Sequence, residues 1–290
     1  QAHLHSWLHS HDVSSIFFRR QELCKTTSGN PVPVLTLTAK PLEVSRPHVF
    51  LSARVHPGET NSSWIMKGLV DFLLSSKPLA QRLRQTFVFK LVPMLNPDGV
   101  INGCHRCSLE GQDLNRQWSY PDARMHPTVF HSKALLQYLE SVTHSPLLLC
   151  DFHGHSRRYN VFVYGCSPSK SWRSQDQVQE DDQIYEASLA FFYSSPAFAL
   201  DQCCFEVERS KESTARVTAW RQLGIKLSYT LECSLSGCNH GMYAGFHLGL
   251  AQLQQIGTEF GHALSRLGLS GHSSMVQLDP ACSDLVASCR

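Results

Sequence analysis

The chain has 290 residues, of which 42% are hydrophobic and 17% are charged, which is enough for one large hydrophobic core. Its 26 Lys and Arg residues nearly balance its 24 Asp and Glu residues, so the net charge of +2 argues against binding nucleic acid through bulk charge. No run approaches the roughly 20 apolar residues of a membrane span, so we expect neither nucleic acid nor a membrane as a partner. Any recognition of an acidic substrate has to be local.

The eleven cysteines are odd in number and scattered, which argues against a disulfide framework in a chain of this length. We expect most of them to be small, buried apolar residues in a reducing compartment. The chain starts at Gln1 rather than Met, and no early segment has the pattern of a signal peptide, so we expect a fragment. The histidines at positions 3, 5, 9 and 11 lack ordered ligand spacing, and we expect them to be solvated.

Strands and helices are expected to alternate along the chain. Buried or β-branched runs predict strands at 32–38, 49–53, 87–95, 147–150, 161–164, 203–208 and 226–232. Apolar residues at helical spacing predict helices at 57–73, 130–142, 182–194, 213–221 and 243–266, the first of which begins at Pro57. Residues 96–99 read Asn-Pro-Asp-Gly, which is a turn signal. The alternation indicates an α/β fold with helices on both faces of a sheet.

Polar residues with chemical potential follow several of the expected strands. His56 and Glu59 come after the strand at 49–53, and Asp151 and His153 come after the strand at 147–150. Glu232 closes the strand at 226–232. Because ligands of open α/β sheets bind beyond the carboxyl ends of strands, we expect these side chains to gather at one edge.

His56 and Glu59 are three residues apart, and a helix starting at Pro57 would let both reach one ion. Catalytic zinc sites use three protein ligands plus a water, and two histidines with one glutamate form such a set. The third ligand is expected from His153 or His155, and His153 is favoured because it lies nearer the strand end. Taken alone, the pair also fits a helix-capping histidine and a glutamate that stabilises the helix dipole.

Five motifs follow one another in a fixed order: His56-Pro57-Gly58-Glu59, Asn96-Pro97-Asp98-Gly99, Asp113-Leu114-Asn115-Arg116, Asp151-Phe152-His153 and Glu232. With their flanking residues they strongly resemble the cytosolic carboxypeptidases, a group of zinc metallocarboxypeptidases, over about residues 17–266. The resemblance is closest to types one and four. It implies a mixed, mostly parallel twisted sheet with helices on both faces. It also implies a cytosolic monomer that removes glutamates from tubulin tails and related acidic C-termini.

The resemblance implies a role for each motif residue. One zinc ion per chain would be held by His56, Glu59 and His153. Asp113 would orient the first ligand histidine, since a ligand imidazole needs its other N–H paired to fix its tautomer. Glu232 would be the general base that takes a proton from the attacking water. Without the resemblance, a strand-end ion pair would be the favoured interpretation of Glu232.

Three further residues would bind and polarise the substrate. The resemblance implies that Arg106 polarises the scissile carbonyl and stabilises the oxyanion. Asn115 and Arg116 match the pair that grips the terminal carboxylate, a task that suits the planar guanidinium fork. A lone Asn-Arg pair is more often part of a surface loop. Cys104, two residues before Arg106, stands where the group usually has Asn.

A pocket for a glutamate side chain needs a positive group, and four basic residues are available: Arg157, Arg158, Lys211 and Arg216. We expect Arg216 to fill this role because it starts a short helix in a matched segment, and we keep Arg157 beside it as substrate-binding. The other basic residues are expected to be solvated surface charges.

The resemblance and the composition of the two ends suggest a division of the chain. We expect residues 1–40 to be the end of a truncated N-terminal β domain, 41–270 the zinc carboxypeptidase catalytic domain, and 271–290 a flexible tail. Two other functions fit parts of the pattern. One is a zinc amidohydrolase acting on N-acyl amino acids, and the other is a catalytically weak binding module that retains the fold.

Overall fold

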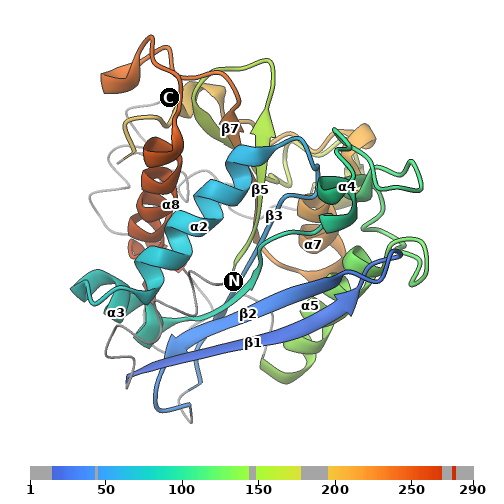
Figure 1. Cartoon of the computed structure of the whole chain (residues 1–290), viewed down its shortest axis with the longest axis horizontal. Coiled ribbons are helices and arrows are strands. Elements are labelled where there is room, and N and C mark those ends of the chain that lie inside the picture. The colour runs from blue at the N-terminus through green and yellow to red at the C-terminus, as the bar shows by residue number, and fades with distance from the viewer. Residues whose placement is uncertain (1–14, 43–44, 144–147, 178–194, 270–275, 279–290) are drawn as a thin grey trace.

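The computed structural model describes residues 15–42, 45–143, 148–177, 195–269 and 276–278. These residues contain a seven-stranded sheet with the order β1-β2-β4-β3-β5-β7-β6 (Figure 1). Its strands are β1 (Ile16–Lys25), β2 (Pro31–Ala39), β3 (His48–Ala53), β4 (Val88–Val92), β5 (Leu148–His155), β6 (Val161–Tyr164) and β7 (Leu227–Ser234). The four central strands run parallel, whereas β1, β2 and β6 pair antiparallel. The predicted mixed α/β fold is confirmed, with its parallel strands at the centre.

Helices cover both faces of the sheet. On one face lie α2 (Thr60–Leu74), α3 (Pro78–Thr86) and α8 (Leu250–Leu264), and on the other lie α5 (Pro127–Thr143) and α7 (Ala215–Leu223). Each set packs with sheet residues into its own apolar cluster. Successive residues of β3 alternate between the two clusters, with Val49 and Leu51 in the first and Phe50 in the second, as the pleat requires.

Shorter elements complete the fold. Within the described ranges they are α4 (Pro97–Ile101), the antiparallel pair β8 (Leu267–Leu269) and β9 (Val276–Leu278), and five single turns of 3-10 helix. The turns are η1 (Leu114–Arg116), η2 (Ser174–Asp176), η4 (Leu200–Gln202), η5 (Arg209–Lys211) and η6 (Gly241–Tyr243). The loops between β-strands and helices carry most of the residues described below.

Helices α2 and α8 touch through their backbones. A Cβ atom on Gly257 would lie 2.1 Å from the Ile65 carbonyl oxygen, and one on Gly68 would lie 2.1 Å from the Gln254 carbonyl oxygen. Two glycines facing each other therefore allow an approach that any side chain would prevent. This contact fixes α2, whose first turn carries part of the site.

Two predicted element boundaries near the site were wrong. Helix α2 begins at Thr60 and not at Pro57, because the Gly58 N–H donates to the His105 carbonyl at 2.8 Å instead of joining a helix. The turn predicted at 96–99 is the start of the single-turn helix α4. The Asn96 side chain caps it by accepting a hydrogen bond from the Gly99 N–H at 3.0 Å.

Two predictions in the second half of the chain were also wrong. Residues 203–208 form no strand, since only isolated bridges join Cys204 to Tyr164 and Val207 to Ser171. Helix α8 begins at 250 and not at 243, because the Phe246 carbonyl accepts from the Cys238 N–H and folds 238–246 into a loop. The other strands and helices predicted within the described residues are confirmed, and β5 runs on to residue 155.

Several expectations concern the ends of the chain and its cysteines. Strands β1 and β2 are hydrogen-bonded into the same sheet as the rest, and the division at residue 40 stays a prediction. The four early histidines, the helix at 182–194 and most of 271–290 lie outside the described residues. The nine cysteines in the described part of the chain are free thiols, and five of them are buried. In that part, no helix combines the length and apolar character needed to cross a membrane.

Candidate metal centre

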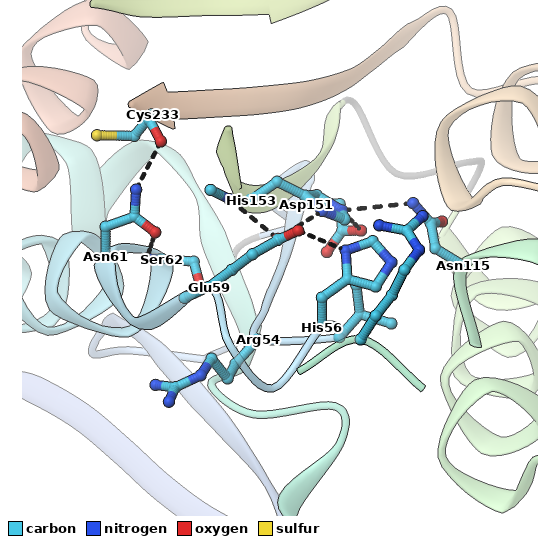
Figure 2. A network of polar contacts seen from close by, with 12 residues as sticks. Arg54, His56, Glu59, Asn61, Ser62, Asn115, Asp151, His153 and Cys233 are labelled. Atoms are coloured by element: carbon cyan, nitrogen blue, oxygen red, sulfur yellow. Dashed lines mark hydrogen bonds and ion pairs between the residues drawn. The ribbon is translucent and has the colours of Figure 1, made fainter. Parts of the chain in front are cut away.

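Three side chains converge at the C-terminal edge of the parallel strands (Figure 2). His56 follows β3, Glu59 directly precedes α2, and His153 lies near the end of β5. One ligand atom of each lies within 4.8 Å of the other two. His56 Nδ1 is 2.7 Å from Glu59 Oε1, and His153 Nδ1 is 3.0 Å from Glu59 Oε2. Both imidazoles therefore turn the same nitrogen towards one carboxylate.

The backbone around Glu59 holds this arrangement. The Gly154 N–H donates to Glu59 Oε2 at 2.9 Å. A Cβ atom on Gly154 would lie 2.3 Å from Asn61 Oδ1, so only glycine brings this N–H so close. Asn61 in turn donates from Nδ2 to the Cys233 carbonyl at 2.5 Å. The first turn of α2 is thus tied to β7, and Glu59 is fixed between β5 and α2.

The structure separates the two histidines that the sequence offers as the third ligand. His153 contacts Glu59, as described above. His155 instead accepts at Nδ1 from the backbone N–H groups of Arg157 and Arg158, at 3.3 and 2.9 Å. Among the described residues, His155 belongs to no group of potential metal ligands.

Each candidate ligand histidine has a carboxylate behind it. His56 Nε2 lies 3.1 Å from Asp113 Oδ1, and His153 Nε2 lies 2.6 Å from Asp151 Oδ2. The residue implied to orient His56 is therefore in position to do so. The partner of His153 was missed, although Asp151 precedes it by two residues in β5. That spacing puts both side chains on one face of a strand, which is the signal that could have found it.

Opposite charges hold the cluster in a charged state. Burial raises the pKa of Glu59, but the charges and hydrogen bonds of His153 and His56 outweigh burial and bring it below its usual range. Burial lowers the pKa of His153, but Asp151 and Glu59 outweigh burial and bring it well above its usual value. Asp113 behaves like Glu59, because His56 and Arg106 outweigh its burial and lower its pKa. Such a concentration of carboxylates and imidazoles suits a cation.

The residues present fit zinc and a neighbouring base. Two imidazole nitrogens and one carboxylate oxygen are a donor set of catalytic zinc, which keeps a further position for water. Glu232 on β7 is paired in register with His153 on β5. Its Oε2 is buried and has no hydrogen-bond partner among the described residues. Burial raises the pKa of Glu232 to about 7, and the charge of Glu59 adds to this rise.

Asp113 also holds Arg106. Arg106 Nε and Nη2 donate to Asp113 Oδ2 at 3.0 and 2.7 Å, while Oδ1 of the same carboxylate faces His56. Oδ1 also accepts from the Asn115 N–H at 2.9 Å. The side chain of Arg106 remains 45% exposed, so the guanidinium is fixed on one side and open on the other.

Asn115 and Arg116 lie on the far side of the histidines, in η1. Asn115 Oδ1 accepts from the Ala215 N–H at 3.0 Å, and its Nδ2 lies 3.4 Å from His153 Nε2. Arg116 Nη1 donates to the Asn115 carbonyl at 3.0 Å. The structure thus brings the predicted carboxylate-binding pair next to the candidate ligands.

The four basic candidates for a side-chain pocket differ in exposure. Arg216 on α7 is buried, and its Nη1 donates to the Gly165 carbonyl and, at 3.3 Å, to Cys166 Sγ. Arg157 and Arg158 are exposed, and Lys211 is partly buried.

Arg216 is also directed towards the strand that carries Glu232. Its guanidinium lies 6.0 Å from the centre of the Tyr164 ring. Tyr164 pairs with Thr230 on β7, two residues before Glu232 and therefore on the same face. Only Arg216 of the four is both buried and placed beside this face, while Arg157 points to solvent.

The comparisons with known proteins agree with this geometry. Residues 4–260 match the family described as zinc carboxypeptidase, and the chain belongs to that family. Cytosolic carboxypeptidase 1 of Homo sapiens is 49% identical over 282 residues, covering 92% of this chain and 23% of the relative. Cytosolic carboxypeptidase 4 of Mus musculus is 47% identical over 273 residues, covering 89% of this chain and 23% of the relative. The resemblance found in the sequence is confirmed, and the chain spans about a quarter of the length of these relatives.

Solved structures share the fold. A metallo-carboxypeptidase from Burkholderia cenocepacia has a TM-score of 0.71 at 25% identity, covering 91% of this chain and 68% of that one. A metallo-carboxypeptidase from Pseudomonas aeruginosa has a TM-score of 0.73 at 22% identity, covering 91% and 66%. The sheet and its helices are therefore those of a metallocarboxypeptidase.

Proposed function

We propose that this chain is the catalytic domain of a zinc carboxypeptidase that removes glutamates from acidic protein tails, tubulin among them. The position of Glu232 carries the proposal. Its Oε2 is buried without a hydrogen-bond partner among the described residues, and Glu232 is in register with His153, which suits a base that acts beside a metal. The family and the donor set of His56, Glu59 and His153 support the metal.

The residues of the chain divide the reaction among them. A zinc ion held by His56, Glu59 and His153 supplies Lewis acidity for the attacking water and the scissile carbonyl. Glu232 takes the proton of the water and passes it to the leaving amine. A carboxyl whose pKa is about 7 can do both near neutral pH. Arg106 stabilises negative charge that develops on the carbonyl oxygen, an effect on the order of 3 kcal/mol.

Binding of the terminal carboxylate of the substrate is what makes an enzyme an exopeptidase. Arg116 offers a planar fork to the terminal carboxylate, and Asn115 adds its amide. Arg216 is the residue we assign to the glutamate side chain. Among the described residues its hydrogen bonds come from Nη1, which leaves Nε and Nη2 for a carboxylate.

The substrate class and the setting extend this proposal. Two relatives are named cytosolic carboxypeptidases, which supports action in the cytosol on protein tails. We expect this protein to act as a monomer. Its partners would be proteins with glutamylated tails, tubulin first among them. The buried positive charge of Arg216 supports a preference for glutamate over apolar residues.

A Glu232→Gln variant tests the proposal. We expect the wild-type chain to release free glutamate from a peptide that ends in several glutamates, and not from the same peptide with an amidated C-terminus. The variant should keep its zinc and lose turnover by at least about 100-fold, which is the usual contribution of general acid–base catalysis. Arg216→Ala should lose glutamate preference, while Arg124→Ala, at an exposed position with no assigned role, serves as the matched control.

Other outcomes would point elsewhere. Turnover of the Glu232→Gln variant at the wild-type rate would contradict the assigned base. Hydrolysis of N-acetylglutamate, without release of glutamate from the peptide, would indicate a zinc amidohydrolase. A purified chain without zinc affinity would indicate a binding module.

A further inference from the structure

We propose that Asp151 is a positioning residue for the metal, which fixes the tautomer and orientation of His153 so that Nδ1 is presented to zinc. The inference rests on the metal site of the proposed function. It adds to that site a carboxylate that lies behind His153, on the side away from Glu59.

Asp151 is completely buried, and its two oxygens have separate partners. Oδ2 lies 2.6 Å from His153 Nε2, and Oδ1 accepts a hydrogen bond of 2.6 Å from Ser52 Oγ. Ser52 on β3 pairs in register with Asp151 on β5, so the two side chains leave the sheet side by side. A buried carboxylate is costly unless it is paired, and here His153 provides the pairing group.

The chemistry of imidazole determines what this contact does. A neutral imidazole carries its proton on one nitrogen and a lone pair on the other. Without a metal, Glu59 and Asp151 each accept a proton from one nitrogen of the ring. A bound metal would replace the proton on Nδ1, and the remaining proton would then lie on Nε2, because the Asp151 carboxylate can only accept. Nδ1 is the atom that lies 3.0 Å from Glu59 Oε2, at the metal side of the ring. The carboxylate also makes the imidazole a stronger base and hence a better ligand.

A competing contact is weaker. Asn115 Nδ2 lies 3.4 Å from the same His153 Nε2, but the amide and the protonated nitrogen are both donors. The distance to Asp151 is shorter by 0.8 Å, since it is 2.6 Å. Asp151 therefore sets the tautomer.

The second histidine shows the same design with a different carboxylate. His56 Nε2 lies 3.1 Å from Asp113, and its Nδ1 faces Glu59. Asp113 is partly exposed and also holds Arg106, whereas Asp151 is shielded from solvent and is held by Ser52. The two ligands are thus oriented alike, and the deeper one depends on a carboxylate that has no second task at the substrate.

Zinc affinity of the purified chain tests the inference, by competition with a chromophoric chelator. Asp151→Asn keeps the shape and removes the charge, and we expect the dissociation constant for zinc to rise about 10- to 100-fold. Ser52→Ala leaves the carboxylate but removes its support, and a rise of about fivefold is expected. Thr38→Val is the matched control, since Thr38 is a buried hydrogen-bonding residue of β2 that donates to the Arg84 and Phe87 carbonyls. It should lower thermal stability and leave zinc affinity unchanged.

Cobalt provides a second readout. The visible spectrum of the cobalt-loaded protein should change in Asp151→Asn and stay unchanged in Thr38→Val, because only the first alters the ligand field of His153. Zinc affinity of Asp151→Asn and Ser52→Ala within twofold of wild type would overturn the inference and leave the proposed function intact. A wild-type chain that binds no zinc would overturn both. If Asp151→Asn does not fold, the result for Ser52→Ala decides.

Discussion

Removing the carboxyl of Glu232, the proposed base, should make the metal-free protein more stable. The Oε2 atom of Glu232 is buried and has no hydrogen-bond partner in the described part of the chain, and burial raises the pKa of this carboxyl from 4.5 to about 7 on folding. The folded state therefore binds this proton more tightly than the unfolded state. The resulting destabilisation is absent below about pH 4.5, grows as the pH rises and is complete above about pH 7.

The size of the effect follows from the shift. At about 1.4 kcal/mol per pKa unit, the charged Glu232 lowers the free energy of unfolding by about 3 kcal/mol at pH 8. Glutamine carries no charge, but its buried amide also lacks a partner, and this offsets part of the gain. We expect Glu232→Gln to raise the free energy of unfolding at pH 8 by about 1–3 kcal/mol.

Urea denaturation of the metal-free protein at several pH values measures this. The stability of the variant relative to wild type should rise by about 3 kcal/mol between pH 4 and pH 8, because only the wild type gains the buried charge. Glu140→Gln, at an exposed position of α5, is the matched control and should stay within about 0.5 kcal/mol of wild type at every pH. A Glu232→Gln variant that is no more stable than wild type at pH 8 would refute the reasoning. So would a gain that does not depend on pH.

Two further substitutions test the contact between α2 and α8 and the proposed stabilisation of the oxyanion by Arg106. Gly257→Ala places a Cβ atom 2.1 Å from the Ile65 carbonyl, and should lower the free energy of unfolding by at least about 2 kcal/mol in urea. Ala251→Gly, on an exposed position of the same helix, should cost only about 1 kcal/mol, and equal losses would contradict the packing explanation. Arg106→Ala should reduce kcat on a glutamate-ending peptide by about 100- to 1000-fold without loss of zinc. An unchanged kcat would remove Arg106 from the mechanism.

The sequence predicted the site residues that lie at or just after the C-terminal ends of strands. His56 and His153 come from neighbouring parallel strands, and Glu232 comes from the next, so the rule for open α/β sheets brought them to one edge. The start of α2 was not predictable in the same way. The Gly58 N–H bonds to the His105 carbonyl, a partner 47 residues away that no local pattern reveals.

The basic residues show a second limit. The sequence does not distinguish Arg157 from Arg216, yet Arg157 is exposed and Arg216 is buried against Tyr164. Burial of a long charged side chain depends on the elements packed over it, and Arg216 of α7 is covered by the loop after β6. The contact of Asp151 with His153 was missed although their spacing along β5 could have revealed it, whereas its contact with Ser52 depends on the register of β3 and β5, which the sequence does not show.

The pairing of β3, β5 and β7 also sets the order of folding and metal binding. His56 and His153 are almost a hundred residues apart, and Glu232 lies about eighty residues further on, so the two candidate ligand histidines meet only after non-local strand pairing. Closing such long loops is a late and slow step in folding. Zinc therefore has no preformed site in the early chain and cannot nucleate this fold as it does in small zinc domains. Zinc therefore binds after folding, and the species that takes up zinc is the folded, metal-free protein.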